Sequence, residues 1–179
     1  MNKPEYLIIH TEASPISTDA PRFDVVNQYH RQRLFDRSSL GFYVGYHYFI
    51  EKAGKILQSR ADIDEGMHTV GYNLKSLGIC LAGNGDMELP TLAQTETLKK
   101  LINEKAKQYN IPKNKILPHR LLLNHHEKTC YGQLLKDDWA ASLVEEKVEV
   151  ITKQKQILSL QQQILNLISR ILALLTKKK

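Results

Sequence analysis

The chain has 179 residues, of which 42% are hydrophobic and 25% are charged. This composition supports one folded core with an appendage and excludes an intrinsically disordered chain. Its two cysteines are too few for a disulfide framework, so they indicate a reducing compartment or thiols with a chemical role. The apolar run at the amino terminus spans only about four residues, and the sequence therefore predicts cytoplasmic synthesis without a signal peptide.

The formal net charge of +6 is unevenly distributed along the chain. Residues 143–179 contain seven Lys or Arg and three acidic residues, which leaves a net charge of +2 for residues 1–142. Because most of the basicity belongs to the tail, the charge does not predict a specific nucleic-acid partner.

The first half of the chain begins with a short apolar run, residues 5–10, which predicts a buried strand that ends in a histidine. A helix follows, for which Asp19 is the expected N-cap and Pro21 belongs to the first turn. Residues 43–59 predict two strands around an Ala-Gly turn.

The next elements continue this alternation. Residues 76–84 form another apolar run and predict a buried strand. Thr91 and Gln94 form a capping box that begins a second helix, which runs to about Tyr109. Residues 111–120 predict a turn, a very short strand and a histidine at its end. Because strands and helices alternate, we expect an α/β fold with a mixed central β-sheet flanked by helices.

The tail, residues 143–179, has a different composition, because no acidic residue follows Glu149 and no Gly or Pro follows Gly132. Apolar residues recur every seven positions, a pattern that favours a parallel two-stranded coiled coil. Ile occupies heptad position a and Leu position d: Ile157, Ile164, Ile171, Leu160, Leu167 and Leu174. A second apolar set widens this face: Leu158, Leu165, Ile168 and Leu172.

This pattern predicts an amphipathic, coiled-coil-like helix with three open functions. It could assemble a homo-oligomer, pack on the preceding domain, or bind an anionic membrane surface, and oligomerisation is the first expectation. A membrane-spanning helix is not expected, because Arg170 and the Gln161–Gln163 run would lie inside the hydrocarbon.

The two cysteines differ in their surroundings. Cys80 lies between apolar neighbours in a predicted strand and is interpreted as a core residue. Cys130 lies in a polar loop two residues after Lys128, whose ammonium would favour the thiolate that a metal or a nucleophilic reaction needs. A catalytic zinc site would require two further ligands and a position for water, whereas a Cys/His nucleophilic hydrolase is the main rival.

Histidines at strand ends supply candidate ligands. His10 and His119 each end a predicted strand, so the sheet can direct both toward one site. His125 or His126 could replace His119, although both are close to Cys130 in sequence. His30 falls on the apolar face of a predicted helix and is interpreted as a structural residue.

Several blocks together resemble a known family. In order, and across roughly residues 5–142, they are similar to the zinc-dependent N-acetylmuramoyl-L-alanine amidases of the peptidoglycan-recognition and phage-lysozyme type. The blocks are "YLIIHTEAS", "VGYHYFIEKAGKILQSR", "GMHTVGYNLKSLGICLAGN", "LPTLAQTETLKKLI", "ILPHR" and "KTCYG". The chain departs from the family pattern at Tyr131, where a proline usually follows the cysteine, and in a longer loop before Cys130.

The resemblance implies a role for each matching residue. It implies one zinc ion per chain, bound by His10, His119 and Cys130. It implies that Tyr46 and Lys128 assist catalysis. It also implies that His68 and Asn73 line a substrate groove, with His47 close behind them.

We therefore expect a catalytic domain in residues 1–142 and a helix for oligomerisation or envelope contact in residues 143–179. The expected activity is hydrolysis of the amide between N-acetylmuramic acid and the L-alanine of the peptidoglycan stem peptide. A phage or prophage endolysin, acting on the cell wall after release, is the first expectation. A non-catalytic peptidoglycan-binding recognition protein and a cytoplasmic muropeptide-recycling amidase are the alternatives.

Overall fold

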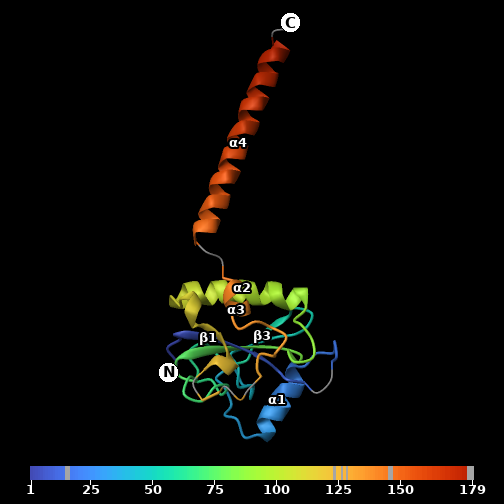
Figure 1. The fold of residues 1–179 in the computed structure, drawn as a ribbon, viewed down its shortest axis with the longest axis vertical. Coiled ribbons are helices and arrows are strands. Elements are labelled where there is room, and N and C mark those ends of the chain that lie inside the picture. Colours follow the sequence, from blue (N-terminus) through green and yellow to red (C-terminus); the bar gives the residue numbers. More distant parts are fainter. Residues whose placement is uncertain (15–16, 123, 126, 128, 145–146, 177–179) are drawn as a thin grey trace. The chain divides into compact units, whose positions relative to one another are not determined.

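The computed structural model divides the chain into two compact units, residues 1–144 and 145–179 (Figure 1). The structure describes residues 1–14, 17–122, 124–125, 127, 129–144 and 147–176, with side-chain exposure in the last helix for residues 154–171. Leu143 and Val144 pack against the core of the first unit. The predicted functional boundary after residue 142 remains a prediction.

A five-stranded sheet forms the centre of the first unit, in the order β3-β2-β4-β1-β5. Strands β2, β4, β1 and β5 pair in parallel, and β3 pairs antiparallel with β2. The strands are β1 (Tyr6–Thr11), β2 (Tyr48–Ile50), β3 (Ile56–Gln58), β4 (Ser76–Leu81) and β5 (Ile116–Pro118). The expected mixed α/β sheet is confirmed, including the antiparallel pair around the Ala-Gly turn.

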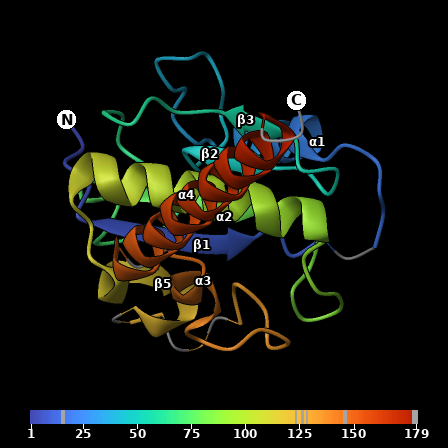
Figure 2. The same ribbon diagram turned by 90° about the horizontal axis from the view of Figure 1, so that it is seen from above.

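Helices cover both faces of this sheet. The helix α2 lies above the sheet and α1 below it in Figure 1, and Figure 2 shows α2 running along the sheet, roughly in line with β1. The α-helices are α1 (Phe23–Gln32), α2 (Leu92–Tyr109), α3 (Trp139–Ser142) and α4 (Lys147–Thr176). Two short 3-10 helices, η1 (Lys113–Lys115) and η2 (His119–Leu121), flank β5.

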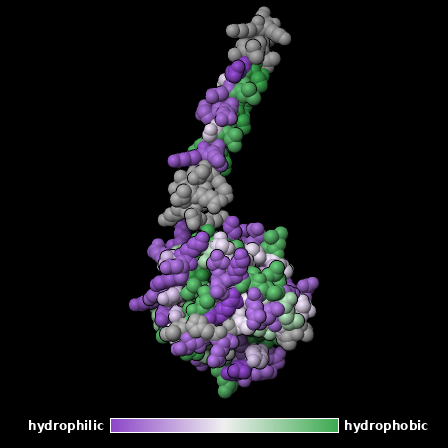
Figure 3. All heavy atoms as spheres, viewed as in Figure 1, coloured by the Kyte–Doolittle hydropathy of each residue, from purple (hydrophilic) through white to green (hydrophobic). Residues whose placement is uncertain are grey.

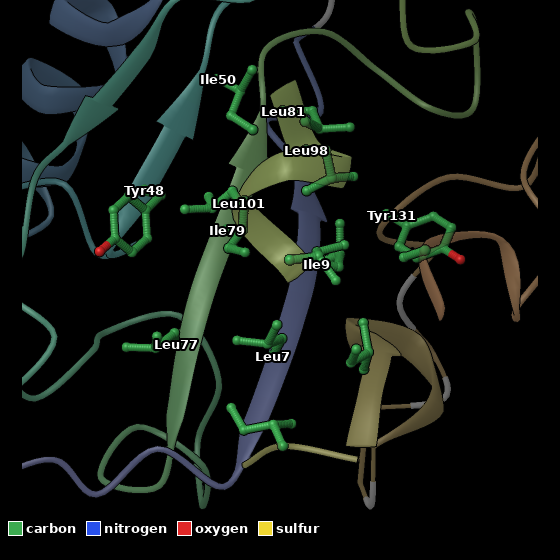
Figure 4. Close-up of a cluster of buried hydrophobic side chains, with 14 of the residues drawn as sticks. Leu7, Ile9, Tyr48, Ile50, Leu77, Ile79, Leu81, Leu98, Leu101 and Tyr131 are labelled. Carbon is green, nitrogen blue, oxygen red and sulfur yellow. The ribbon is translucent and has the colours of Figure 1, made fainter. Parts of the chain in front are cut away.

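The two central strands, β1 and β4, have buried residues on both faces, as expected of parallel strands covered on each side. Leu7 and Ile9 pack with Leu98 of α2 on one face (Figure 4). On the other face, Cys80 packs with Phe23 of α1, so its interpretation as a core residue is confirmed. Burial of each large apolar side chain contributes about 1.5–3 kcal/mol, which fixes the strands that position the site.

The start of α1 differs from the prediction. The predicted N-cap at Asp19 is wrong, because the helix begins at Phe23 and Arg22 occupies the cap position without a capping side-chain bond. The carboxylate of Glu51 instead accepts the backbone N–H groups of Arg22 and Phe23, at 2.8–3.0 Å. A residue distant in sequence thus satisfies the donors that a local cap would have bound.

The second helix agrees with its sequence signal. The hydroxyl of Thr91 accepts the backbone N–H of Gln94, and the side chain of Gln94 accepts the backbone N–H of Thr91. The predicted capping box is therefore confirmed. The helix ends at Asn110, which adopts the left-handed conformation common at C-termini.

The helix α4 is a single amphipathic element, with apolar and polar residues on opposite sides of its described part (Figure 3). The heptad residues with described side chains are 50–58% exposed: Ile157, Leu160, Ile164, Leu167 and Ile171. Leu172 and Leu174 lie outside the residues whose side chains are described. Among the described residues, no helix combines the length and apolarity needed to cross a membrane.

Candidate metal centre

Two parallel strands bring histidines to the same edge of the sheet. His10 is the penultimate residue of β1, and His119 directly follows β5. The strands pair with Ile9 opposite Pro118, so the next residue of each lies beside the other. The ring centroids of His10 and His119 are accordingly 4.6 Å apart. Sheet register thus brings two of the predicted ligands together.

Cys130 joins these histidines from the loop that follows η2. Its Sγ lies 3.6 Å from Nδ1 of His10, and one ligand atom from each of His10, His119 and Cys130 lies within 4.8 Å of the other two. A tetrahedral zinc ion bound through nitrogen at 2.0–2.1 Å and sulfur at 2.3 Å separates those atoms by about 3.5 Å. The donor types and their spacing therefore fit a zinc ion. His125 lies behind His119, with 3.1 Å between Nδ1 of His125 and Nε2 of His119.

Arg120 anchors the loop that carries Cys130. Its backbone N–H donates to the carbonyl oxygen of Cys130 at 2.8 Å. Its guanidinium forms an ion pair with Asp137, with Nε 2.7 Å from Oδ1. The same guanidinium donates to three loop carbonyl oxygens, those of Thr129, Gly132 and Leu135. One residue beside a predicted ligand thus holds residues 129–137, the part of the loop that supplies another ligand.

Tyr131 fixes the other side of the same loop. Its side chain is fully buried, and its hydroxyl donates to the carbonyl oxygens of Lys136 and Asp137 at 2.7 and 3.1 Å. Its ring packs edge-on against Trp139, with 5.7 Å between centroids. The aromatic residue that replaces the family's usual proline is therefore part of the hydrophobic core.

Tyr46 lies beside the candidate ligands. Its ring centroid is 5.0 Å from that of His10. Burial, followed by the nearby thiols of Cys80 and Cys130, raises the pKa of Tyr46 well above its usual value. The hydroxyl is therefore protonated at neutral pH and can donate a hydrogen bond. Lys128, the other predicted catalytic residue, lies outside the described residues.

His68 and Asn73 lie next to the site but make internal contacts. Nδ1 of His68 is 3.1 Å from Nε2 of His10. The side-chain oxygen of Asn73 accepts the backbone N–H groups of His68 and Thr69, at 3.0 and 2.8 Å. Asn73 therefore shapes the turn that presents His68 to His10.

His47 is fully buried, so it has no surface on a groove in this structure. Its Nδ1 accepts the backbone N–H of Gly78 at 3.1 Å, which places the proton on Nε2, 3.1 Å from the carbonyl oxygen of Asp64. Burial lowers the pKa of His47 to about 4. His30 is also buried and accepts the backbone N–H of Gly45, which agrees with its structural interpretation.

Burial keeps both the thiol and one imidazole of the candidate ligands in their neutral forms. Burial, followed by the neighbouring His68, His119 and His125, lowers the pKa of His10 well below its usual value, so its ring is neutral. Burial raises the pKa of Cys130 to about 12. Since a metal binds neutral imidazole and thiolate, a bound cation would replace the thiol proton.

A cavity of about 460 Å³ adjoins Tyr46. The loop after β1 and the helix α1 form its walls, and Glu12 and Arg22 make an ion pair within it at 2.5 Å. The lining residues are Glu12, Ala13, Ser14, Arg22, Val25, Val26, Tyr29, His30 and Tyr46. The cavity offers both apolar surface and paired charges to a ligand beside Tyr46, and none of the three candidate metal ligands is among its lining residues.

The sequence interpretation assigned no role to Arg120 or to this cavity. Arg120 forms part of the "HR" block, so its position beside His119 was the available signal. Its partners lie 9–17 residues away in an irregular loop, and no periodicity reveals such contacts. Glu12 and Arg22 similarly meet only because the chain folds back after β1.

Solved structures of known function share this fold. An N-acetylmuramoyl-L-alanine amidase from Clostridium intestinale, LysC, aligns with a TM-score of 0.62 and 25% identity, over 75% of this chain and 80% of that one. Drosophila PGRP-LB in complex with tracheal cytotoxin aligns with a TM-score of 0.61 and 26% identity, over 75% and 79%. The architecture is therefore that of the amidases and peptidoglycan recognition proteins.

The sequence comparisons agree. The N-acetylmuramoyl-L-alanine amidase family model matches residues 1–133, so the chain belongs to that family. It is 29% identical over 154 residues to an endolysin of Klebsiella phage KP32, covering 82% of this chain and 88% of the endolysin. It is 29% identical over 120 residues to a peptidoglycan recognition protein of Trichoplusia ni, covering 66% and 64%. Endolysins and peptidoglycan recognition proteins are thus both among its relatives, and the chain spans slightly less than two thirds of the length of the recognition protein.

Proposed function

We propose that this chain is a zinc-dependent amidase that separates N-acetylmuramic acid from the L-alanine of the stem peptide, and that it acts on the cell wall as an endolysin. The observation that carries the proposal is the convergence of His10, His119 and Cys130 at the carboxyl ends of parallel strands. Two imidazoles and one thiolate leave a fourth tetrahedral position, which is the pattern of catalytic rather than structural zinc sites.

The reaction adds water to the amide carbonyl, breaks the C–N bond and transfers a proton to the departing amine. Zinc, when bound, supplies a water of lowered pKa and polarises the carbonyl. Tyr46 contributes a protonated hydroxyl beside the ligands, which can donate a hydrogen bond to the negative charge that develops on the carbonyl oxygen. The family resemblance implies that Lys128 supplies a positive charge in this reaction, and in this proposal Tyr46 or Lys128 passes the proton to the amine.

The substrate in this proposal occupies the cavity of about 460 Å³ beside Tyr46. Its exposed apolar wall and the Glu12–Arg22 pair suit a muropeptide, which carries both methyl groups and charged peptide ends. The solved complex of PGRP-LB with tracheal cytotoxin supports a ligand of this class. Because His47, His68 and Asn73 bond internally, we assign them supporting roles behind the groove.

A non-catalytic recognition protein is the second candidate, because recognition proteins share the fold and the family. Turnover on purified peptidoglycan separates the two functions. We expect release of stem peptides with a free L-alanine amino terminus, its loss after chelation, and its return with zinc. Tight binding to the wall without release at any zinc concentration would instead support the recognition protein.

Substitutions divide the catalytic from the metal-binding roles. We expect Tyr46→Phe and Lys128→Ala to retain zinc and to lower turnover by about 100-fold or more, as removal of one transition-state donor does. The zinc content of each purified variant is the control. Loss of zinc from Lys128→Ala would contradict its assigned role. Activity on soluble muropeptides, measured beside activity on intact walls, would distinguish an endolysin from a recycling amidase.

For α4 we propose self-association with a second copy of the chain. Ile at position a and Leu at position d, all exposed in the described part of α4, form the seam that a parallel coiled coil buries. Sedimentation of the full chain and of a variant ending at residue 144 tests this. We expect an oligomer and a monomer respectively, with equal turnover on soluble muropeptides. A monomeric full chain that binds anionic vesicles would replace self-association with membrane binding.

A further inference from the structure

Behind each candidate ligand histidine stands a second histidine. Nε2 of His10 is 3.1 Å from Nδ1 of His68, and Nε2 of His119 is 3.1 Å from Nδ1 of His125. In each pair, Nε2 of the candidate ligand faces Nδ1 of the second histidine. In the first pair the other nitrogen of the ligand ring, Nδ1 of His10, faces Cys130.

The direction of the hydrogen bonds behind His10 follows from a backbone carbonyl. Oγ of Ser76 lies 2.7 Å from the carbonyl oxygen of Tyr72, which can only accept, so the single hydroxyl proton of Ser76 points there. Nε2 of His68 is 3.3 Å from the same Oγ, which is left to accept. Nε2 of His68 must then carry the proton of its ring.

A neutral imidazole carries one proton, so Nδ1 of His68 is an acceptor. Nε2 of His10 lies 3.1 Å from this acceptor and must carry a proton, because two unprotonated ring nitrogens facing each other would repel. The hydroxyl of Thr69 lies 3.0 Å from Nδ1 of His68 and 3.5 Å from Nε2 of His10, and its single proton can serve only one of them. Nδ1 of His10 consequently has no proton. Its lone pair faces Sγ of Cys130, where a metal ligand is required.

The second pair follows the same rule. Nε2 of His125 lies 3.2 Å from the carbonyl oxygen of Val70 and must donate to it. In the neutral ring of His125, Nδ1 is then the acceptor and receives the N–H from Nε2 of His119. This leaves Nδ1 of His119 as the unprotonated nitrogen. These two hydrogen-bonded pairs, which we call relays, thus leave Nδ1 unprotonated in both candidate ligands. His68 supplies the relay to His10, and His125 supplies the relay to His119.

The fold holds the ring of His68 in a slot between two glycines. A Cβ on Gly66 would lie 2.5 Å from its Cδ2, and a Cβ on Gly78 would lie 2.6 Å from its Cδ2 and Cγ. Any other residue at either position would displace the ring. Two small residues are therefore required for the bond between His68 and His10.

We propose that His68 and His125 are positioning residues that hold His10 and His119 in the tautomer with Nδ1 unprotonated, ready to bind the metal. This inference rests on the zinc site of the proposed function. A fixed tautomer and ring orientation lower the cost of metal binding, and loss of such a partner typically weakens metal affinity 10- to 100-fold.

Nuclear magnetic resonance of the full chain with 15N-labelled histidine tests the tautomers directly, with and without zinc. Two-bond and three-bond 1H–15N correlations report which ring nitrogen carries the proton. We expect protons on Nε2 of His10, His68, His119 and His125. A proton on Nδ1 of His68 or His125 would overturn the proposal for that pair.

Zinc affinity, measured by competition with a chelator, tests the consequence. His68→Phe keeps a ring in the slot but cannot accept a hydrogen bond, and we expect a 10- to 100-fold weaker zinc affinity. His68→Asn places an oxygen near the former Nδ1, so we expect affinity within about fivefold of the original chain, by the same reasoning. Equal affinity in His68→Phe and the original chain would contradict a positioning role.

Two further variants complete the design. Tyr48→Phe removes the hydroxyl that a buried ring outside both relays donates to Asp62, and we expect unchanged zinc affinity. Ser76→Ala removes the acceptor behind His68 and remains informative if His68→Phe does not fold; we expect weaker binding by about threefold to tenfold. If the original chain binds no zinc, the proposed metal site fails. If zinc binds with the other tautomers, only the relay fails.

Discussion

The two halves of the metal site are held in different ways. His10 belongs to β1, a strand paired on both sides and buried on both faces. Cys130 belongs to an irregular loop that Arg120 and Tyr131 fasten through a few polar contacts and one buried ring. The sheet half thus depends on the whole core, whereas the loop half depends on single residues. Substitutions should therefore separate metal binding from folding in the loop half more easily.

The largest effect should come from removing the loop's own ligand. We expect Cys130→Ser to lower zinc affinity by at least about 100-fold and to abolish turnover, because a hydroxyl replaces a soft anionic ligand. Zinc content and chelator competition measure this loss. Cys80→Ser changes the other thiol and should retain zinc. Full zinc binding by Cys130→Ser would remove the loop from the site.

Arg120→Ala should break the attachment of the loop while leaving the sheet half intact. It removes the donors to three loop carbonyls and the partner of Asp137, and we expect a loss of about 3 kcal/mol in the free energy of unfolding. Denaturant unfolding measures this, and zinc affinity should fall as well. Arg120→Lys should recover little, because an ammonium cannot reproduce the planar fork. Recovery by lysine would show that charge alone holds the loop.

Gly78→Ala should disturb the sheet half from inside. Its Cβ would lie 2.6 Å from the ring of His68, so we expect about 2 kcal/mol of destabilisation together with weaker zinc binding. Gly54→Ala is a matched control, since its Cβ would meet Ala93 at 2.9 Å and its φ is +80°. That variant should lose stability and keep its zinc affinity. Equal zinc affinity in both variants would contradict the slot for His68.

The last prediction concerns the pH dependence of the free energy of unfolding that the buried ring of His47 causes. His47 has a folded pKa of about 4, below its unfolded value near 6.5, so it stabilises the fold above pH 6.5. That contribution is lost as pH falls from 6.5 through 4, because the unfolded chain binds the proton first. The loss reaches about 2 kcal/mol at pH 5.

Thermal unfolding of the metal-free chain between pH 7 and 5 measures this dependence. Asp62, Asp64 and Arg60 also act on His47, and burial is the largest cause. His47→Asn should retain an acceptor for the N–H of Gly78 and show a shallower decline. An unchanged decline would assign the pH dependence to other groups.

Much of the site follows from the order of residues along the chain. His10 ends an apolar run that becomes β1, and His119 ends the short run that becomes β5. Parallel pairing then places their ends together. The N-cap of α1 did not follow in this way, because Glu51 reaches that helix across 29 residues and displaces the local signal at Asp19.

Sequence by itself determined the alternation of strands and helices, the capping box of α2 and the heptad pattern of residues 157–174. These depend on local periodicity, capping chemistry and residue type. The set of three candidate ligands came from the family resemblance and stays a prediction. Only the tertiary structure decided that His125 stands behind His119, that two glycines hold His68, and that Arg120 fastens the loop. The position of a ring proton depends on the acceptor that the ring meets in space. Only folding brings the carbonyl oxygen of Tyr72 to the hydroxyl of Ser76, and that of Val70 to Nε2 of His125.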